Sequence, residues 1–397
     1  MHTLLIFAHV PPPHHGQSYV VAQLLEELRA YPDEVRIFHV DSRVSDTLEE
    51  IGRIAPGKVW RLLRFCCQAI QIRLRYGPMI FYYVPAPANH SPLVRDWLVM
   101  TLCRPFFRRR LILHWHSVGL GGWLARNKLG AFPKWLSQRT LGGAELSLVC
   151  APSVAGDAAV LRPRQIRALP NGISDPCPDF DRTLLPARLV RVGGPRAVFR
   201  VLFLALCTPE KGLYDALAGV VEAQHRLHAT GVPTRLRLTV AGQFLGAKER
   251  AAFLEAVSRS TAEWPADAGP PPEVECVGFV AGEAKDRLLR ESDCFCFPTY
   301  YPNEVMPVSL IEAMAYGLPV VATRWRTIPE TLPASGSFLV DIRRPSAVAS
   351  ALCAAMENRD FAGLREHFLS NHLRQVFGRR FLEAVQECFP AAARPAA

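Results

Sequence analysis

The chain has 397 residues, of which 49% are hydrophobic and 21% charged, and its formal net charge is +10. This composition argues against a disordered or fibrous protein, and the lack of any run of eighteen apolar residues argues against a membrane-spanning helix. The length is sufficient for two domains, each with its own hydrophobic core.

The first residues, MHTLLIFAHVPPP, contain neither a basic leader nor a small-residue cleavage site. They therefore predict a first β-strand and a protein that stays in the cytoplasm. The eleven cysteines are scattered, mostly lie within apolar runs and form no C-x-x-C pair. This pattern favours buried thiols over disulfides or a zinc site.

Short apolar or β-branched runs alternate with helical stretches as far as residue 150. This alternation is typical of a parallel sheet covered by helices, so it predicts an α/β fold. The five runs are LLIFAHV, VRIFHV, MIFYYV, LILHWH and LSLVC.

Positive charge is concentrated between residues 51 and 95, where seven Lys or Arg residues and no acid occur. Polar residues recur every three or four positions in KVWRLLRFCCQAIQIRLRY, which predicts a helix with an apolar face containing Trp60, Leu63, Phe65 and Ile70. Two interpretations stay open: a buried crossover helix with a solvated basic edge, or a surface at residues 53–75 that rests on an anionic membrane. Arg108, Arg109 and Arg110 would extend that surface.

A nucleic-acid partner is not expected for this basic region, because no groove-reading motif or stacking platform accompanies the charge.

The alternation of strands and helices starts again after a segment rich in Pro and Arg. The five runs of this second half are VLFLALC, LRLTVAG, VECVGF, CFCFP and LPVVAT. We expect an N-terminal Rossmann-like domain at 1–175, a linker at 176–198 and a second Rossmann-like domain at 199–366. Residues 367–397 would form a C-terminal helix that packs back toward the first domain, followed by a short disordered tail, PAAARPAA. Because doubly wound sheets bind ligands at the carboxyl ends of their strands, we expect an active site in a cleft between two facing domains.

Two common nucleotide-binding motifs are missing. No G-x-G-x-x-G follows the first strand, and GLGGWL at residue 119 lacks the last small residue and follows another strand. No G-x-x-x-x-G-K-[ST] occurs either. A nicotinamide or flavin enzyme and a P-loop NTPase are therefore not expected.

The stretch YYPNEVMPVSLIEAMAYGLPVVATRW places Glu304 in a loop and Glu312 in a helix predicted from Pro307 to Gly317. The start of a helix attracts phosphate, and carboxylates beside it can accept hydrogen bonds from sugar hydroxyls. The pair therefore suits a nucleotide sugar. The alternative is structural: two surface glutamates of an ordinary αβ unit.

The E-x7-E spacing followed by AMAYGLPVVAT resembles the signature of retaining glycosyltransferases of family 4, which have the GT-B fold of two doubly wound Rossmann-like domains. The resemblance implies that Glu304 holds hydroxyls of the donor sugar and Glu312 the ribose of the nucleotide. It also implies a sugar and phosphate pocket lined by the backbone of Val305, Met306 and Pro307, with Ser309 as a phosphate contact.

Other elements resemble the family in the same order along the chain. CTPEKGLYDAL provides Lys211 for the diphosphate, but Leu206 stands where the family commonly has an arginine, a contact that Arg324 or Arg326 could supply. Without the family, Lys211 could be an ordinary solvated turn residue. The resemblance further implies the following residues: Gly16 in the phosphate loop, where the family's second glycine is His15; His116 facing the donor sugar, with His114 inside the strand; and Gly242 in AGQ, with VGF at 277–279, near the base.

The resemblance implies transfer of a sugar from a nucleoside-diphosphate sugar to an acceptor, with retention and without a metal or cofactor. Glu304, His116 and Lys211 would carry the catalysis, and the acceptor would be a lipid-linked or cell-surface glycan precursor. If the basic helix rests on a membrane, the protein would lie on the cytoplasmic face of the inner membrane. Two alternatives stay open: a silent nucleotide-sugar-binding subunit, suggested by Leu206 and His15, and a nucleotide-sugar epimerase on the same fold.

Overall fold

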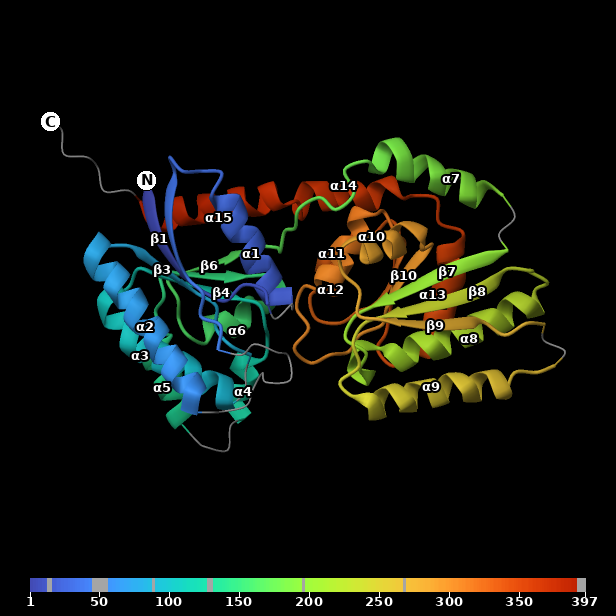
Figure 1. Cartoon of the computed structure of the whole chain (residues 1–397), viewed down its shortest axis with the longest axis horizontal. Coiled ribbons are helices and arrows are strands. Elements are labelled where there is room, and N and C mark those ends of the chain that lie inside the picture. Colours follow the sequence, from blue (N-terminus) through green and yellow to red (C-terminus); the bar gives the residue numbers. More distant parts are fainter. Residues whose placement is uncertain are drawn as a thin grey trace. The chain divides into compact units, whose positions relative to one another are not determined.

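The computed structural model describes seven stretches of the chain, which form two compact units. The first unit comprises residues 1–174 and 371–397, and the second comprises residues 175–370. Each contains a six-stranded sheet of parallel strands wrapped by helices (Figure 1). The described residues are 1–12, 16–44, 56–87, 90–126, 131–194, 197–266 and 269–390.

The sheet of the first unit has the strand order β2-β1-β3-β4-β5-β6. Because β2 and β3 flank β1, the direction of winding reverses beside β1, and the loop that follows β1 opens at this switch point. Gly16 begins the helix after that loop. The strands are β1 (His2–Phe7), β2 (Val35–Val40), β3 (Ile80–Tyr83), β4 (Leu111–Trp115), β5 (Leu146–Val149) and β6 (Gln165–Ala168).

Helices cover both faces of this sheet, with α2 and α3 on one face and α1 and α15 on the other (Figure 1). An ion pair between Arg374 and Glu26 joins α15 to α1. The helices of the unit are α1 (Gly16–Leu28), α2 (Pro56–Tyr76), α3 (His90–Phe107), α4 (Leu120–Arg126), α5 (Phe132–Thr140), α6 (Ala155–Ala159) and α15 (Arg374–Cys388).

The basic helix predicted around residues 58–76 is confirmed as α2, but its predicted apolar face was wrong at Trp60. The core-facing side carries Leu62, Cys66 and Ala69 at helical spacing, whereas Trp60 is 72% exposed. Apolar residues occur on nearly every side of this helix. The spacing of its polar residues was therefore not enough to predict which side packs against the sheet. Residues 53–55 of the predicted membrane surface lie outside the described residues.

The sheet of the second unit has the strand order β12-β11-β10-β7-β8-β9, with the switch point between β10 and β7. Helices α8 and α13 pack against one face of it (Figure 1). Its strands are β7 (Val198–Leu204), β8 (Arg235–Ala241), β9 (Glu273–Gly278), β10 (Cys294–Phe297), β11 (Val320–Thr323) and β12 (Ser337–Val340), and its main helices are α7 (Leu185–Gly193), α8 (Leu213–Ala229), α9 (Ala247–Ala262), α10 (Gly282–Glu291), α11 (Val308–Ala315), α12 (Ile328–Thr331), α13 (Pro345–Met356) and α14 (Ala362–Asn371).

Of the twelve strands in the described residues, ten were predicted from the sequence and are confirmed. The other two, β6 and β12, are the last strands at one edge of each sheet. Their sequences, QIRA and SFLV, are four residues long and mostly half-buried or exposed. Such edge strands lack the continuous apolar run that marks a strand buried on both faces.

Residues 176–198, predicted as a linker, fold as part of the second unit. They form the π-helical turn Phe180–Leu184 and the helix α7. Arg188 of α7 is 2% exposed and donates hydrogen bonds to the carbonyl oxygens of Ser292 (2.8 Å) and Leu289 (2.9 Å), where α10 ends. This buried guanidinium attaches the segment to the second unit. The composition of the segment, rich in Pro and Arg, did not predict a buried arginine.

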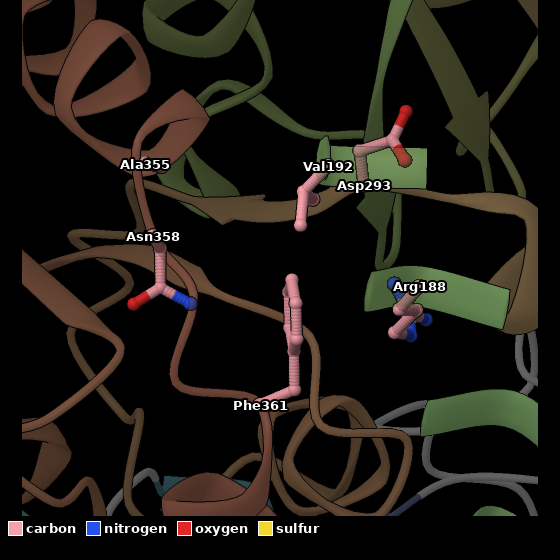
Figure 2. A pocket seen from close by; sticks show the side chains of 6 residues that line it. All are labelled: Arg188, Val192, Asp293, Ala355, Asn358 and Phe361. Carbon is pink, nitrogen blue, oxygen red and sulfur yellow. The ribbon is translucent and has the colours of Figure 1, made fainter. Parts of the chain in front are cut away.

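A small cavity of about 10 Å³ adjoins Arg188, with the side chains of Phe361 and Val192 pointing into it (Figure 2). Such a volume holds one water molecule at most, so it is a packing feature and not a ligand site. The tail that was predicted to be disordered, PAAARPAA, comprises residues 390–397, and all of it except Pro390 lies outside the described residues.

We predict that Arg188→Met lowers the free energy of unfolding by about 2–4 kcal/mol, because it leaves two buried carbonyl groups without their charged donor. Urea denaturation of the full chain measures this. Arg182→Met, which changes an exposed arginine nearby, should stay within about 0.5 kcal/mol of the unchanged chain. Equal losses for the two variants would contradict the role given to Arg188.

Candidate functional site

The predicted residues Lys211 and Glu304 meet at the switch point of the second unit. Strand β10 lies next to β7, so the loops that follow these two strands are neighbours although they are far apart in sequence. Lys211 Nζ donates to Glu304 Oε2 at 2.7 Å, and the two side chains are 18% and 7% exposed. The contact is therefore a largely buried ion pair at the carboxyl edge of the sheet.

Gly212 explains why the lysine loop comes so close to the end of β10. Its φ is +82°, and a Cβ at this position would lie 2.2 Å from the carbonyl oxygen of Pro298. Only glycine combines this left-handed conformation with such a close approach. The P-E-K-G element thus positions Lys211 through its last residue.

Two further residues at this ion pair were missed from the sequence. Thr299 Oγ1 donates to Glu304 Oε2 at 3.2 Å, and Lys211 Nζ lies 4.6 Å from the centre of the Tyr301 ring, a cation–π distance. Both residues come directly after β10, so their position at the end of a buried strand was the signal that could have found them.

The second glutamate, Glu312, lies in α11 and is 6% exposed. Its carboxylate accepts a short hydrogen bond from Lys285 Nζ of α10, which also was not predicted. Both predicted glutamates are therefore buried and each is paired with a lysine. The surface-glutamate alternative does not describe them.

The segment between the two glutamates forms the start of α11. Val305 and Met306 are 5% and 7% exposed, Pro307 is buried, and Ser309 is half-buried in the first turn. Helix α11 begins directly after Pro307, so Ser309, the predicted phosphate contact, is its second residue. A helix start offers N–H groups that have no acceptor within the helix, and this one follows Glu304 by four residues.

Gly242 borders a pocket of about 390 Å³ in the second unit. Its Cβ would meet the carbonyl oxygen of Ala205 at 1.7 Å, so the tight turn after β8 needs glycine. The pocket is lined by both loops that were predicted to lie near the base, 241–243 and 277–279, and its size suits a small ligand. It is lined by Gly242, Gln243, Phe244, Gly246, Ala247, Arg250, Cys276, Val277, Gly278 and Phe279.

Leu206 and the two arginines proposed to replace its missing contact are all on the surface. Leu206 is 38% exposed in the loop after β7. Arg324 and Arg326 are exposed in the loop after β11, which is separated from β7 by β10. Because β11 is not a neighbour of β7, the strand order does not place either arginine directly beside the loop of Lys211.

In the first unit, His114 lies within β4 as predicted and is fully buried, whereas His116 follows the strand and is half-buried. The centres of the two imidazole rings are 4.1 Å apart. Tyr82 of β3 was not predicted; its hydroxyl lies 2.7 Å from His114 Nδ1. Gly16 is exposed at the start of α1, and His15 lies outside the described residues.

Burial fixes the protonation of the Tyr82–His114 pair. It raises the pKa of the Tyr82 hydroxyl well above its usual value, and, together with the neighbouring His116, it lowers the pKa of His114 well below its usual value. The phenol therefore stays protonated and donates to a neutral imidazole. The proton of His114 is then on Nε2, which has no hydrogen-bond partner in the described structure.

The described residues contain no group of three or more His, Cys, Asp or Glu side chains that could hold a metal ion. The eleven cysteines are free thiols, and eight of them are buried, as predicted. Cys67 is exposed, which the sequence did not indicate. In the second unit, two buried Lys–Glu pairs, the start of α11 and a pocket lie at loops that follow the strands of one sheet. Together these groups can bind an anionic ligand rich in hydroxyl groups.

Comparison with known families agrees with this character. Residues 199–358 match the family Glycosyl transferases group 1, and this match covers β7 to α13 of the second unit. The matched part of the chain contains Lys211, Glu304 and Glu312. The family resemblance predicted from the sequence is confirmed.

Curated relatives align with parts of the chain. WcaL of Escherichia coli, a putative colanic acid biosynthesis glycosyltransferase, is 29% identical over 168 residues, which are 41% of this chain and 37% of WcaL. The amylovoran biosynthesis glycosyltransferase AmsK of Erwinia amylovora is 38% identical over 87 residues, 21% of each protein. The chain thus spans little more than a third of the length of the first of these relatives.

Solved structures match nearly the whole chain. The sucrose-phosphate synthase of Thermosynechococcus elongatus superposes with a TM-score of 0.68 and 18% identity, covering 99% of this chain and 100% of that one. The Anabaena protein HepE, crystallised with UDP and glucose, gives a TM-score of 0.63 and 15% identity over 97% and 100%. The predicted fold class, GT-B with two Rossmann-like domains, is confirmed.

The protonation of His114 predicts a dependence of stability on pH. The unfolded chain gains a proton at this residue near pH 6.5, whereas the folded chain does so only at lower pH, because the pKa of the folded state is lowered. The free energy of unfolding should therefore decrease as the pH falls below about 6.5, by up to about 1.4 kcal/mol per pH unit for each such histidine. His114→Gln should reduce this slope in urea denaturation between pH 7.5 and 5.5, and an unchanged slope would contradict the assignment.

Proposed function

We propose that the chain transfers a sugar from a nucleoside-diphosphate sugar to a glycan acceptor, with retention at the anomeric carbon. The observation that carries this proposal is the buried Lys211–Glu304 pair at the switch point of a domain that matches Glycosyl transferases group 1. One partner can neutralise phosphate and the other can hold hydroxyl groups, which are the two chemical features of a nucleotide sugar.

The donor binds along the carboxyl edge of the second unit in this proposal. Lys211 and the first turn of α11 contact the diphosphate, and Glu304 accepts hydrogen bonds from the sugar. Glu312 holds the ribose, and Lys285 orients its carboxylate through the hydrogen bond described above. The base enters the pocket beside Gly242. For the first unit, we propose that Gly16 and His116 also contact the donor.

The reaction breaks the bond between the anomeric carbon and the diphosphate oxygen and forms a bond from the same carbon to the acceptor oxygen. The acceptor attacks from the face on which the diphosphate departs, and its proton goes to the leaving phosphate. Lys211 and backbone N–H groups stabilise the charge that develops on the diphosphate, so the proposal includes no metal. No protein nucleophile is assigned, because Lys211 and Thr299 already engage the carboxylate of Glu304.

The acceptor in this proposal is a lipid-linked precursor of a cell-surface polysaccharide, handled on the cytoplasmic face of the membrane. The relatives named for colanic acid and amylovoran biosynthesis support the polysaccharide class. None of the helices in the described stretches is long and apolar enough to cross a membrane. The basic helix α2 would provide peripheral attachment.

One observation favours a second candidate function. Leu206 removes a cation from the diphosphate site, which would suit a subunit that binds a nucleotide sugar without consuming it. An epimerase on the same fold is the third possibility, and it would consume donor with no acceptor present.

We predict that Glu304→Ala lowers donor turnover by at least about 100-fold, because the sugar loses the group that holds its hydroxyls in the transition state. The same change should cost only about 1–3 kcal/mol in the free energy of unfolding, since Lys211 is partly exposed and can reach water. Both quantities are measured on the full chain. Turnover is measured as donor consumption with and without a membrane extract, which is the source of acceptor, and the free energy of unfolding is measured by urea denaturation.

Glu210→Ala is the matched control, because it removes an exposed carboxylate next to Lys211 and should leave turnover unchanged. Turnover of Glu304→Ala equal to that of the unchanged chain would contradict the assignment. Donor consumption without acceptor would favour the epimerase, and no consumption under any condition would favour the silent subunit.

A further inference from the structure

One part of the first unit carries more positive charge than the net charge of the whole chain. Residues 51–144 contain fifteen Lys or Arg residues and a single acid, Asp96, so this quarter of the chain has a formal net charge of +14 against +10 for the whole. Asp96 is fully buried and paired with Arg95. No carboxylate of this segment therefore offsets its cations at the surface.

The helices α2, α3 and α5 from this segment run in the same direction. Arg73 near the end of α2 donates to the carbonyl oxygen of Phe106 near the end of α3 at 3.1 Å. Trp97 of α3 donates to Ser137 of α5 at 2.9 Å, and Arg104, further along α3, donates to the carbonyl oxygen of Thr140 at the end of α5 at 2.6 Å. The first turns of the three helices thus lie at one end of the layer.

That end is the carboxyl edge of the sheet. All strands of the first unit are parallel, and α2 and α3 follow β2 and β3, so these helices begin where the strands end. In a doubly wound sheet this is the edge at which substrates bind. Figure 1 shows the three helices together on one side of the first unit.

Exposed aromatic side chains occupy the beginnings of α2 and α5. Trp60 is 72% exposed, Phe132 59% and Trp135 58%, and the rings of Phe132 and Trp135 are 6.0 Å apart. Of the seven tryptophans, all of which lie in the described stretches, Trp60 and Trp135 are the two exposed ones. Arg64 and Lys134 are exposed beside them. We call Trp60, Arg64, Phe132, Lys134 and Trp135 the aromatic–basic rim.

We propose that the aromatic–basic rim docks on an anionic lipid bilayer, with Trp60, Phe132 and Trp135 in the headgroup region and Arg64 and Lys134 on lipid phosphates. This inference rests on the proposed function, and it deepens that function by fixing which part of the protein faces the lipid that carries the acceptor. The carboxyl edge of the first unit would then be next to the membrane surface, so a lipid-linked acceptor reaches it without leaving the bilayer.

Charge and side-chain type favour a bilayer over other polyanions or a protein partner. Tryptophan prefers the interface between water and hydrocarbon, where its ring is partly buried and its N–H stays hydrated. Lys and Arg beside it gain attraction from anionic headgroups. A nucleic acid would reward the cations but not two isolated, exposed tryptophans on separate helices, since base stacking needs a continuous platform.

The test uses the full chain and sedimentation with two kinds of vesicle, pure phosphatidylcholine and phosphatidylcholine mixed with phosphatidylglycerol. We expect binding to the mixed vesicles only, and about 30-fold weaker binding for the double variant Arg64→Gln/Lys134→Gln, since each cation near the surface contributes about fivefold. Trp60→Ala/Trp135→Ala should also weaken binding by at least tenfold. Brominated lipid should quench tryptophan fluorescence in the unchanged chain and not in Trp60→Phe/Trp135→Phe.

The controls are Arg182→Gln and Val190→Ala, which change an exposed cation and an exposed apolar residue of the second unit and should bind vesicles as the unchanged chain does. Vesicle binding that is the same in the rim variants and the controls would overturn the proposal, as would binding to duplex DNA or RNA but not to mixed vesicles. Stabilisation by the donor nucleotide sugar, measured in the same rim variants, separates the two claims. If the rim variants lose vesicle binding but are still stabilised by the donor, the result supports the proposal for the rim. If the donor stabilises none of the chains, the result counts against the proposed function alone.

Discussion

The neighbouring positions of β7 and β10 in one parallel sheet are the constraint on which the candidate site depends. They bring Lys211 and Glu304, separated by 93 residues in the sequence, into a buried ion pair at 2.7 Å. Removing two charges from water is costly, and such a pair is rarely favourable for stability alone. The arrangement is understandable if a ligand separates the pair when it binds, with its phosphate contacting the lysine and its hydroxyl groups contacting the glutamate.

The two units divide the chemistry between them. The second unit has the paired carboxylates, the family match and a pocket bordered by Gly242, all of which suit a nucleotide sugar. The first unit has the excess of positive charge, the exposed tryptophans and a neutral, buried His114 beside His116. The donor and the acceptor side of one reaction would account for this difference in surface character.

The sequence predicted the strands buried on both faces, because a continuous apolar run identifies them, and it predicted Lys211, Glu304 and Glu312 through a spacing shared with a known family. It did not predict Lys285 or Tyr82, since a lysine in a surface helix and a tyrosine in a buried strand are common in any fold. The partner of each is known only once the elements are packed. Arg188 was missed for the same reason, because a basic, proline-rich segment normally stays in solvent.

The most direct test of the account is the melting temperature of the full chain with UDP-, GDP-, ADP- and TDP-sugars, each with and without EDTA. A donor at a hundred times its dissociation constant adds about 2.7 kcal/mol to the free energy of unfolding. We predict that one donor raises the melting temperature, that EDTA does not change this rise, and that Glu312→Ala removes it. No rise with any donor would contradict the central claim that the second unit binds a nucleotide sugar.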